Sequence, residues 1–393
     1  MYIFSLHLSI AYKHYLICLL ILVGVICYYV NVYDNTTGGD NVEENKDLQN
    51  LQETEEACDE EYDEEYEEYY EESKVKTVLK KIFSVVFNKK VIAVLLALII
   101  VSQVITGVVL GSAVVKPDTF NESSEEEGII RFPLSESAYV KWLEVKAEKV
   151  IVKNSEGKNL SGITLSDNVT SHSYIIMCHS LTSAALDMAS YAYHFYDLGF
   201  NVIIPDSRGY GDDEYSKTSF GYFEKNDVLD WVNDVVKKDD KAKIFLFGVG
   251  MGGSTVLLSA SLNLPDNVKA IISDSAYSDV KALFKENIKD FYSVPSFPAV
   301  EIASLYVKAT EGWSFSDVDV VESVEKSQVP ILIIHGGEDT IVPVDQSNDL
   351  YEACPVKGSD HLLIRGAMHA QTQNFKSEKY WQGVDEFILK NLG

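Results

Sequence analysis

From about residue 139 onward, short apolar runs alternate with stretches in which apolar residues recur every three or four positions. The short runs are typical of buried strands, and the longer recurrence is typical of amphipathic helices. Regular alternation of the two predicts an α/β fold with a mostly parallel sheet and crossover helices. Eight strands are expected, at Val150–Lys153, Leu160–Leu165, Tyr174–Cys178, Asn201–Ile204, Ile244–Phe247, Ala270–Ser273, Ile331–His335 and His361–Ile364. Helices are expected at Ala184–Leu198, Lys225–Lys237, Gly252–Leu262, Gln346–Ala353 and Lys376–Leu392.

Two longer apolar runs precede this region. Val91–Val115 contains no charged residue over about 25 positions, which is long enough to cross a bilayer, and it is expected to be a transmembrane helix. Tyr15–Val30 is also uncharged but is shorter, so it could be a first transmembrane helix or the apolar part of a signal-like segment.

Charge divides the N-terminal third further. Almost every residue between Glu53 and Glu72 is Asp, Glu or Tyr, which predicts a disordered acidic segment, whereas six lysines lie between Lys74 and Lys90. Lysines before an apolar span favour a cytoplasmic location for that side, so the C-terminal domain is expected on the exported side of the cell membrane. The expected segments are 1–33, 34–73, 74–90, 91–115 (transmembrane), 116–138 (linker) and 139–393 (globular domain).

The formal net charge of −27 argues against a nucleic-acid partner, because phosphate binding needs clustered Lys and Arg. The five cysteines show neither a disulfide framework nor the spacing of a metal site. We therefore expect no metal ion and no cofactor.

The predicted strand Ile244–Phe247 runs into the sequence Gly248-Val-Gly-Met-Gly-Gly253, which a helix follows. Taken alone, Gly248, Gly250 and Gly253 match the dinucleotide-binding G-x-G-x-x-G pattern. The same turn also matches a nucleophile elbow, G-x-S-x-G, with Gly250 in place of the serine.

Residues near the ends of later strands favour the elbow. Asp339 follows the predicted strand Ile331–His335, and His369 follows His361–Ile364, which gives the chain order nucleophile, acid, histidine of a serine hydrolase. A dinucleotide pattern normally opens its domain, whereas here about four strands precede it.

From Tyr139 to Gly393 the sequence resembles membrane-anchored bacterial α/β-hydrolases related to the serine aminopeptidase S33 and lysophospholipase-like group. The resemblance is carried by Arg208-Gly-Tyr-Gly-Asp212, Ile271-Ile-Ser-Asp-Ser-Ala-Tyr277, Asp339 and His369-Ala370. It implies an α/β-hydrolase fold with an eight-stranded sheet and a small cap near 279–320. It also implies that Asp339 is the acid, that His369 is the general base, and that the N–H groups of Met251 and Leu181 face a developing oxyanion.

The sequence departs from this family at two positions. Gly250 replaces the elbow serine, and Ser180 replaces the glycine of the His-Gly oxyanion loop. The favoured interpretation is a degenerate serine hydrolase that binds a small acyl or peptide-like ligand, or a protein partner. The alternatives are a working hydrolase, in which His369 and Asp339 activate a water or in which Ser254 or Ser180 substitutes for the nucleophile, and more remotely a dinucleotide-binding protein.

Overall fold

The computed structural model describes residues 88–117, 138–166, 170–181, 183–212, 214–292 and 295–392. The predictions for 1–33 and 34–73, and most of those for 74–90 and 116–138, lie outside the described residues. Within the described part, residues from Thr106 onward form one compact unit, and residues up to Ile105 belong to another.

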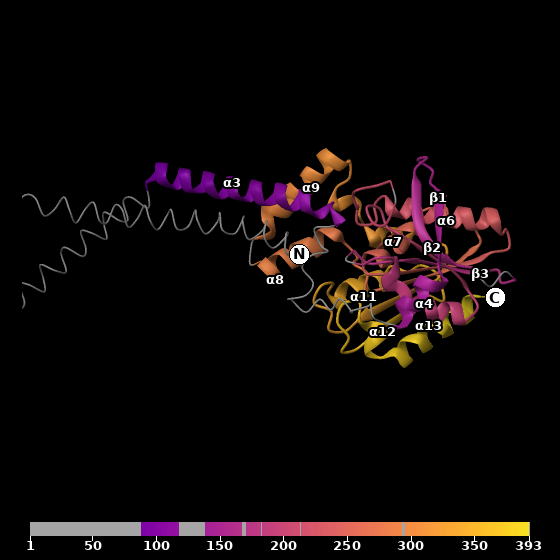
Figure 1. The fold of residues 1–393 in the computed structure, drawn as a ribbon. Coiled ribbons are helices and arrows are strands. Elements are labelled where there is room, and N and C mark those ends of the chain that lie inside the picture. Colours follow the sequence, from indigo (N-terminus) through magenta and orange to yellow (C-terminus); the bar gives the residue numbers. More distant parts are fainter. Residues whose placement is uncertain are drawn as a thin grey trace, which may run out of the picture. The chain divides into compact units, whose positions relative to one another are not determined.

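The compact unit is built on one eight-stranded sheet (Figure 1). Its order is β1-β2-β4-β3-β5-β6-β7-β8, and only the β1–β2 and β2–β4 pairs are antiparallel. The strands are β1 (Glu148–Lys153), β2 (Asn159–Leu165), β3 (Ser173–Cys178), β4 (Asn201–Pro205), β5 (Lys243–Val249), β6 (Val268–Asp274), β7 (Ile331–Gly336) and β8 (Asp360–Ile364). All eight predicted strands are confirmed to within two residues at either end.

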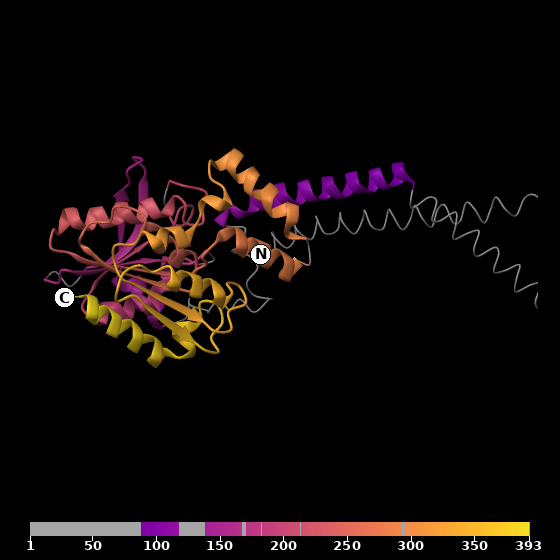
Figure 2. The ribbon, with the colours of Figure 1, turned by 180° about the vertical axis from the view of Figure 1, so that it is seen from behind.

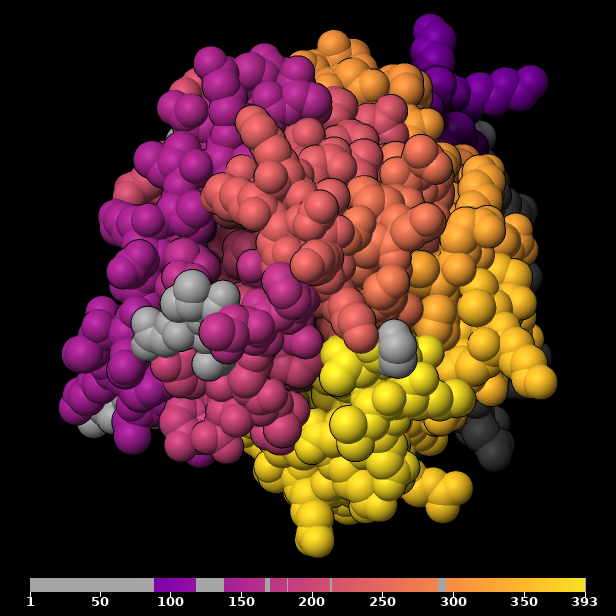
Figure 3. Space-filling model, turned by 90° about the vertical axis from the view of Figure 1, so that its right-hand side faces the viewer, coloured from indigo at the N-terminus to yellow at the C-terminus, as the bar shows by residue number. Residues whose placement is uncertain are grey.

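Helices cover both faces of the sheet, as Figures 1 and 2 show. The helices α4 (Ala138–Lys146), α5 (Ala189–Asp197) and α13 (Ser377–Asn391) pack on one face, with η4 (Ala185–Met188) before α5 and α12 (Thr372–Phe375) before α13. The helices α6 (Glu224–Lys238), α7 (Met251–Ser259) and α11 (Val344–Glu352) pack on the other. The central strands are continuously apolar because both of their faces are covered. In Figure 3, residues of the early strands (purple to magenta) and C-terminal residues (yellow) appear on the same face of the molecule although they are distant in sequence.

The segment between β6 and β7, where the sequence indicated a cap, is mostly helical. It contains α8 (Val280–Tyr292), α9 (Ser296–Glu311), η5 (Phe315–Asp317) and α10 (Val320–Glu325). Its aromatic residues Phe284, Trp313 and Phe315 are buried and contact one another. Ordinary packing therefore accounts for these three rings without a ligand.

The apolar run forms the helix α3 (Lys89–Val114), and among the described residues only α3 is long and apolar enough to cross a membrane. Its last turns belong to the compact unit, where Leu110 and Val114 are fully buried in the hydrophobic core. Gly107 and Gly111 face α9 so closely that a Cβ at Gly107 would lie 2.5 Å from Ile302 Cβ, and one at Gly111 would lie 2.8 Å from the Ala303 carbonyl oxygen. Small residues at this spacing allow two helix backbones to approach closely.

Candidate active site

The turn between β5 and α7 places Gly250 at the carboxyl end of the sheet. Its backbone angles, φ 56° and ψ −121°, are costly for any residue with a side chain but readily accessible to glycine. The Gly250 N–H donates a 2.8 Å hydrogen bond to the Asp274 carbonyl oxygen, which fixes the turn against the end of β6. The sharp turn that the sequence predicted is therefore present.

The flanking glycines are explained by contacts within the protein. A Cβ at Gly252 would collide with the Cys178 carbonyl oxygen at the end of β3, and one at Gly253 would lie 2.9 Å from Ser273 Oγ in β6. Both glycines allow α7 to begin directly against two strands. This packing accounts for the glycine-rich sequence without a phosphate group, so we do not carry the dinucleotide interpretation further.

Asp339 and His369 meet although they lie on separate loops, after β7 and β8. Asp339 Oδ2 is 2.8 Å from His369 Nδ1, and Asp339 Oδ1 accepts hydrogen bonds from the N–H groups of Ile341 and Val342. Burial opposes the charge of each group, but each stabilises the other, so the pKa of Asp339 is lowered and that of His369 is raised. The Asp339 carboxylate therefore fixes Nδ1 of the imidazole as the protonated nitrogen and leaves Nε2 free to act.

His335 supports the same loop. It is fully buried, and its Nε2 lies 2.9 Å from the Val342 carbonyl oxygen and 3.3 Å from Asp339 Oδ2. Burial lowers the pKa of His335, so it is neutral at pH 7 and holds the turn around Asp339.

His369 faces Gly250 across a small space. A Cβ added at Gly250 would lie 3.7 Å from His369 Nε2, so a hydroxyl on it could reach that nitrogen. The same Cβ would collide with Ser180 Oγ, which comes from the loop after β3. The structure therefore brings Gly250, Ser180, His369 and Asp339 together.

The loop that carries Ser180 and Leu181 is held by His179 and Tyr210. His179 Nδ1 lies 2.8 Å from the Ser180 carbonyl oxygen, and His179 Nε2 accepts a 3.0 Å hydrogen bond from the Ser207 N–H. The Tyr210 hydroxyl donates to the Leu181 carbonyl oxygen. His179 has both ring nitrogens engaged and is fully buried, which agrees with a structural role.

Sequence reasoning missed a buried network behind His369. Asp274 Oδ1 accepts a 2.9 Å hydrogen bond from the Ser275 hydroxyl, and Asp274 Oδ2 accepts a 2.5 Å hydrogen bond from Thr372. Ser275 Oγ in turn accepts a 3.2 Å hydrogen bond from the Ala370 N–H, next to His369. Burial raises the pKa of Asp274 to about 6. The only signal in the sequence was the polar Ser-Asp-Ser at the end of a buried strand.

Two other candidate nucleophiles are buried. Ser254 Oγ donates to the Tyr277 carbonyl oxygen and accepts from the Tyr277 N–H, both at 3.0 Å. Burial raises the pKa of the Cys178 thiol to about 12, so its reactive thiolate is scarce at pH 7. Neither side chain is free to face a ligand.

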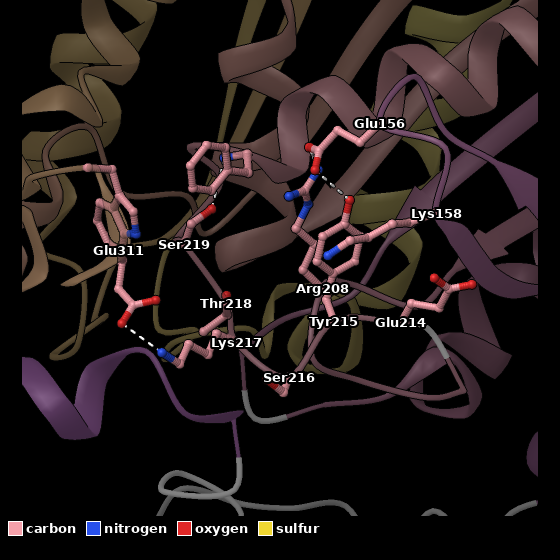
Figure 4. Close-up of a pocket in the computed structure, with 12 residues that line it drawn as sticks. Glu156, Lys158, Arg208, Glu214, Tyr215, Ser216, Lys217, Thr218, Ser219 and Glu311 are labelled. Carbon is pink, nitrogen blue, oxygen red and sulfur yellow. Dashed lines mark hydrogen bonds and ion pairs between the residues drawn. The ribbon is translucent and has the colours of Figure 1, made fainter.

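A separate cavity of about 310 Å³ lies beside this site (Figure 4). Lys158 and Arg208 both stack on the Tyr215 ring, and Lys217 pairs with Glu311 across the opening. Gly250, Asp339 and His369 do not line this cavity. Its wall includes Thr218, whose hydroxyl lies 3.5 Å from Sδ of Met251, the residue after Gly250.

Comparison with known proteins supports the hydrolase reading of this arrangement. The family model described as alpha/beta hydrolase fold matches residues 174–309, and the model described as serine aminopeptidase S33 matches residues 298–374. Uncharacterized protein YqkD of Bacillus subtilis is 28% identical over 61% of this chain and 78% of its own length. The uncharacterized membrane protein YNL320W of Saccharomyces cerevisiae is 22% identical over 62% of this chain and 80% of its own.

Among solved structures, the esterase Pf2001 of Pyrococcus furiosus has the same fold, with a TM-score of 0.53 and 24% identity over 64% of this chain and 95% of its own. Sheet order, strand-end loops and family matches lead to one conclusion. The chain is a member of the α/β-hydrolase family.

Proposed function

We propose that this protein is a membrane-anchored α/β-hydrolase-family protein that cleaves an ester or amide bond in a small acyl or peptide-like ligand. Gly250 occupies the position of the family's nucleophile and is degenerate, so no acyl-enzyme forms there. The oxygen that attacks the ligand is instead activated by His369, which Asp339 orients. The ion pair between these two residues, beside an elbow without a side chain, is the observation that carries the proposal.

The chemistry follows from the position of His369 Nε2. Because Asp339 stabilises the imidazolium, His369 can accept a proton from an attacking oxygen and return it to the leaving group. Met251 begins α7, so its N–H has no partner within the helix and, with the Leu181 N–H, is a candidate donor to the developing oxyanion. A water in the space beside Gly250 is the simplest attacking group.

The second candidate function, binding without turnover, is favoured by the absence of a hydroxyl at Gly250. Loss of a triad nucleophile costs roughly 10⁶ in rate and leaves about 10³–10⁴ over the reaction in water. A protein that retained the pocket alone would bind an acyl or peptide-like ligand or a partner. This is the interpretation that the sequence favoured, and the retained His369–Asp339 pair is the reason that we place hydrolysis before it.

Ester turnover by the full-length protein in detergent micelles tests this proposal. Short-chain p-nitrophenyl esters should be hydrolysed by the wild type, and His369→Ala should reduce the rate by about 10²–10⁴, the usual contribution of a general base. His172→Ala is the matched control, because His172 is exposed and its ring, within the described residues, pairs only with Asp239. Equal rates in wild type and His369→Ala would leave binding as the function.

The proposed anchor is the part of α3 outside the compact unit, residues 89–105, which at 1.5 Å per residue spans about 26 Å, close to the bilayer core of about 30 Å. The lysine-rich residues before α3 favour the cytoplasm, which places the hydrolase domain outside. External protease added to intact cells should therefore digest the domain. A domain that is digested only after the membrane is permeabilised would reverse the proposed orientation.

A further inference from the structure

Ser180 and Gly250 are the two positions at which the sequence departs from its family, and they lie against each other in the structure. Ser180 is in the loop after β3 and Gly250 is in the turn after β5, 70 positions further along the chain. A Cβ at Gly250 would collide with Ser180 Oγ. In this conformation the Ser180 hydroxyl lies next to the position that a side chain at 250 would take.

The Ser180 hydroxyl borders the space that His369 faces. A Cβ on residue 250 would contact Ser180 Oγ and would lie 3.7 Å from His369 Nε2. Among the described residues, neither Ser180 Oγ nor His369 Nε2 has a hydrogen-bond partner, and the two atoms are not hydrogen-bonded to each other. Ser180 is partly exposed, unlike Ser254, which is fully buried and bonded twice to Tyr277.

We propose that Ser180 is the nucleophile of this site, so that the attacking hydroxyl has moved from the β5 turn to the loop after β3. This inference rests on the proposed hydrolytic function and replaces water as the first attacking group. The proposal requires the Ser180 hydroxyl to approach His369 Nε2 when substrate binds, and catalytic hydrogen bonds commonly close only then. Glycine at 250 leaves the space through which the substrate carbonyl reaches Ser180 Oγ.

The reaction balances in two steps. In the first step, Ser180 Oγ bonds to the carbonyl carbon while its proton passes to His369 Nε2. The bond from that carbon to the leaving oxygen or nitrogen then breaks, and His369 protonates the leaving group. Water next attacks the acyl-serine carbon with His369 again as the base. The carboxylic acid leaves, and the proton returns to Ser180 Oγ.

The position of α7 suits the charge that develops. The helix begins at Met251, directly after the turn at Gly250, and the N–H of Met251 has no acceptor within the helix. A partial positive charge at this end stabilises an oxyanion formed on a carbon bonded to Ser180 Oγ. The Leu181 N–H follows the proposed nucleophile directly in the chain, the same relation that Met251 has to Gly250.

A fluorophosphonate probe tests this assignment, because it bonds covalently to the hydroxyl of an activated serine. Full-length protein in detergent micelles is labelled, digested and mapped by peptide mass spectrometry. We expect the label on Ser180, and we expect its loss in Ser180→Ala and in His369→Ala. Ser183→Ala is the matched control, because Ser183 lies on the same loop and, among the described residues, its hydroxyl bonds only the Ala184 carbonyl oxygen. Thermal unfolding of each variant establishes that it is folded.

Ser180→Cys gives a second readout that does not depend on the probe. A thiol at this position should be alkylated by a haloacetamide faster when His369 is present than in the Ser180→Cys, His369→Ala double variant. Equal rates would overturn the assignment.

The remaining outcomes separate this inference from the proposed function. A label on another serine overturns the assignment of Ser180. Ester turnover that persists in Ser180→Ala and is lost in His369→Ala also overturns it, while hydrolysis by activated water stands. No turnover and no label in the folded wild type overturns both and leaves binding alone.

Discussion

The two sides of the candidate site differ in how much of the hydrolase arrangement they keep. On the side of β7 and β8, Asp339 and His369 are paired at 2.8 Å, with His335 and the Asp274 network behind them. On the side of β3 and β5, the backbone of the turn is kept, but the side chains differ, with glycine at 250 and serine at 180. The base is therefore intact, whereas the group that it would serve has changed.

The difference shows that the backbone conformation of the turn does not depend on the side chain that would carry the reacting group. The backbone of Gly250 is held by its hydrogen bond to Asp274 and by the packing of Gly252 and Gly253, none of which needs a side chain at 250. Glycine at 250 therefore supplies no reacting atom but leaves the structural contacts of the turn in place. The loop after β3 can supply a hydroxyl to the same space because that space is shared.

Replacing Asp339 by Asn should give the largest effect on the intact side. The amide keeps the shape of the side chain but removes the charge that stabilises imidazolium, so ester turnover should fall by about 10² or more. Because Asp339 raises the pKa of His369, the acidic limb of the pH–rate profile should also move to lower pH in the variant. An unchanged profile would show that Asp339 does not act through His369.

In the wild type, the raised pKa of His369 gives the sign of the pH dependence. Only neutral His369 accepts a proton, so turnover should rise as pH passes through that raised value. The contribution of His369 to folding stability changes in the opposite direction and falls as pH rises. The stabilisation from imidazolium is complete below the unfolded pKa of about 6.5 and is lost as pH rises through the folded pKa. Turnover rates and thermal unfolding from pH 5 to 9 measure both trends.

The double variant Gly250→Ser, Ser180→Gly should restore the family arrangement on the altered side. Covalent labelling by the fluorophosphonate should then appear at residue 250, because a hydroxyl there lies within reach of His369. The variant should lose about 1–3 kcal/mol of stability, since serine takes up backbone angles that glycine adopts freely. Gly250→Ser alone should label less, because its Cβ meets Ser180 Oγ. A folded double variant without label would refute the assignment of Gly250 to the elbow.

Ser254→Ala should have the smallest effect on chemistry. Its hydroxyl is buried against Tyr277, so probe labelling and turnover should stay within about twofold of wild type, as expected for a group outside the site. The free energy of unfolding should fall by about 1–3 kcal/mol, because the Tyr277 N–H loses its acceptor. Loss of labelling in a folded Ser254→Ala protein would instead make Ser254 the nucleophile.

The sheet was predictable from the sequence because each central strand is a continuous apolar run bounded by turn residues. Ile244–Phe247 and Ile331–His335 show this most clearly, and the structure extends each by at most two residues at either end. The helices α4, α8, α9, α10 and α12 were not predicted. The apolar positions of α9 face two partners, the core and α3, so they do not form the single stripe from which amphipathic helices are read.

The candidate site was predictable where it depends on strand ends. Asp339 and His369 follow predicted strands, and parallel strands bring their carboxyl ends to one edge of the sheet. The contact between Ser180 and Gly250 was not predictable, because it depends on how two loops approach within one side-chain diameter. The hydrogen bond from the Ala370 N–H to Ser275 Oγ, beside His369, was also not predictable, because it joins residues 95 positions apart.

The close fit of Gly107 and Gly111 against α9 has a consequence for any shortened form of this protein. A chain cut after Lys116 would lose Leu110 and Val114, whose side chains are fully buried among core residues. Truncating one large buried apolar side chain costs about 2–5 kcal/mol, comparable to a sizeable part of a domain's total stability of about 5–15 kcal/mol. Proteolytic shedding at that point would therefore release an unstable domain, and a stable soluble form would have to retain the final turns of the helix.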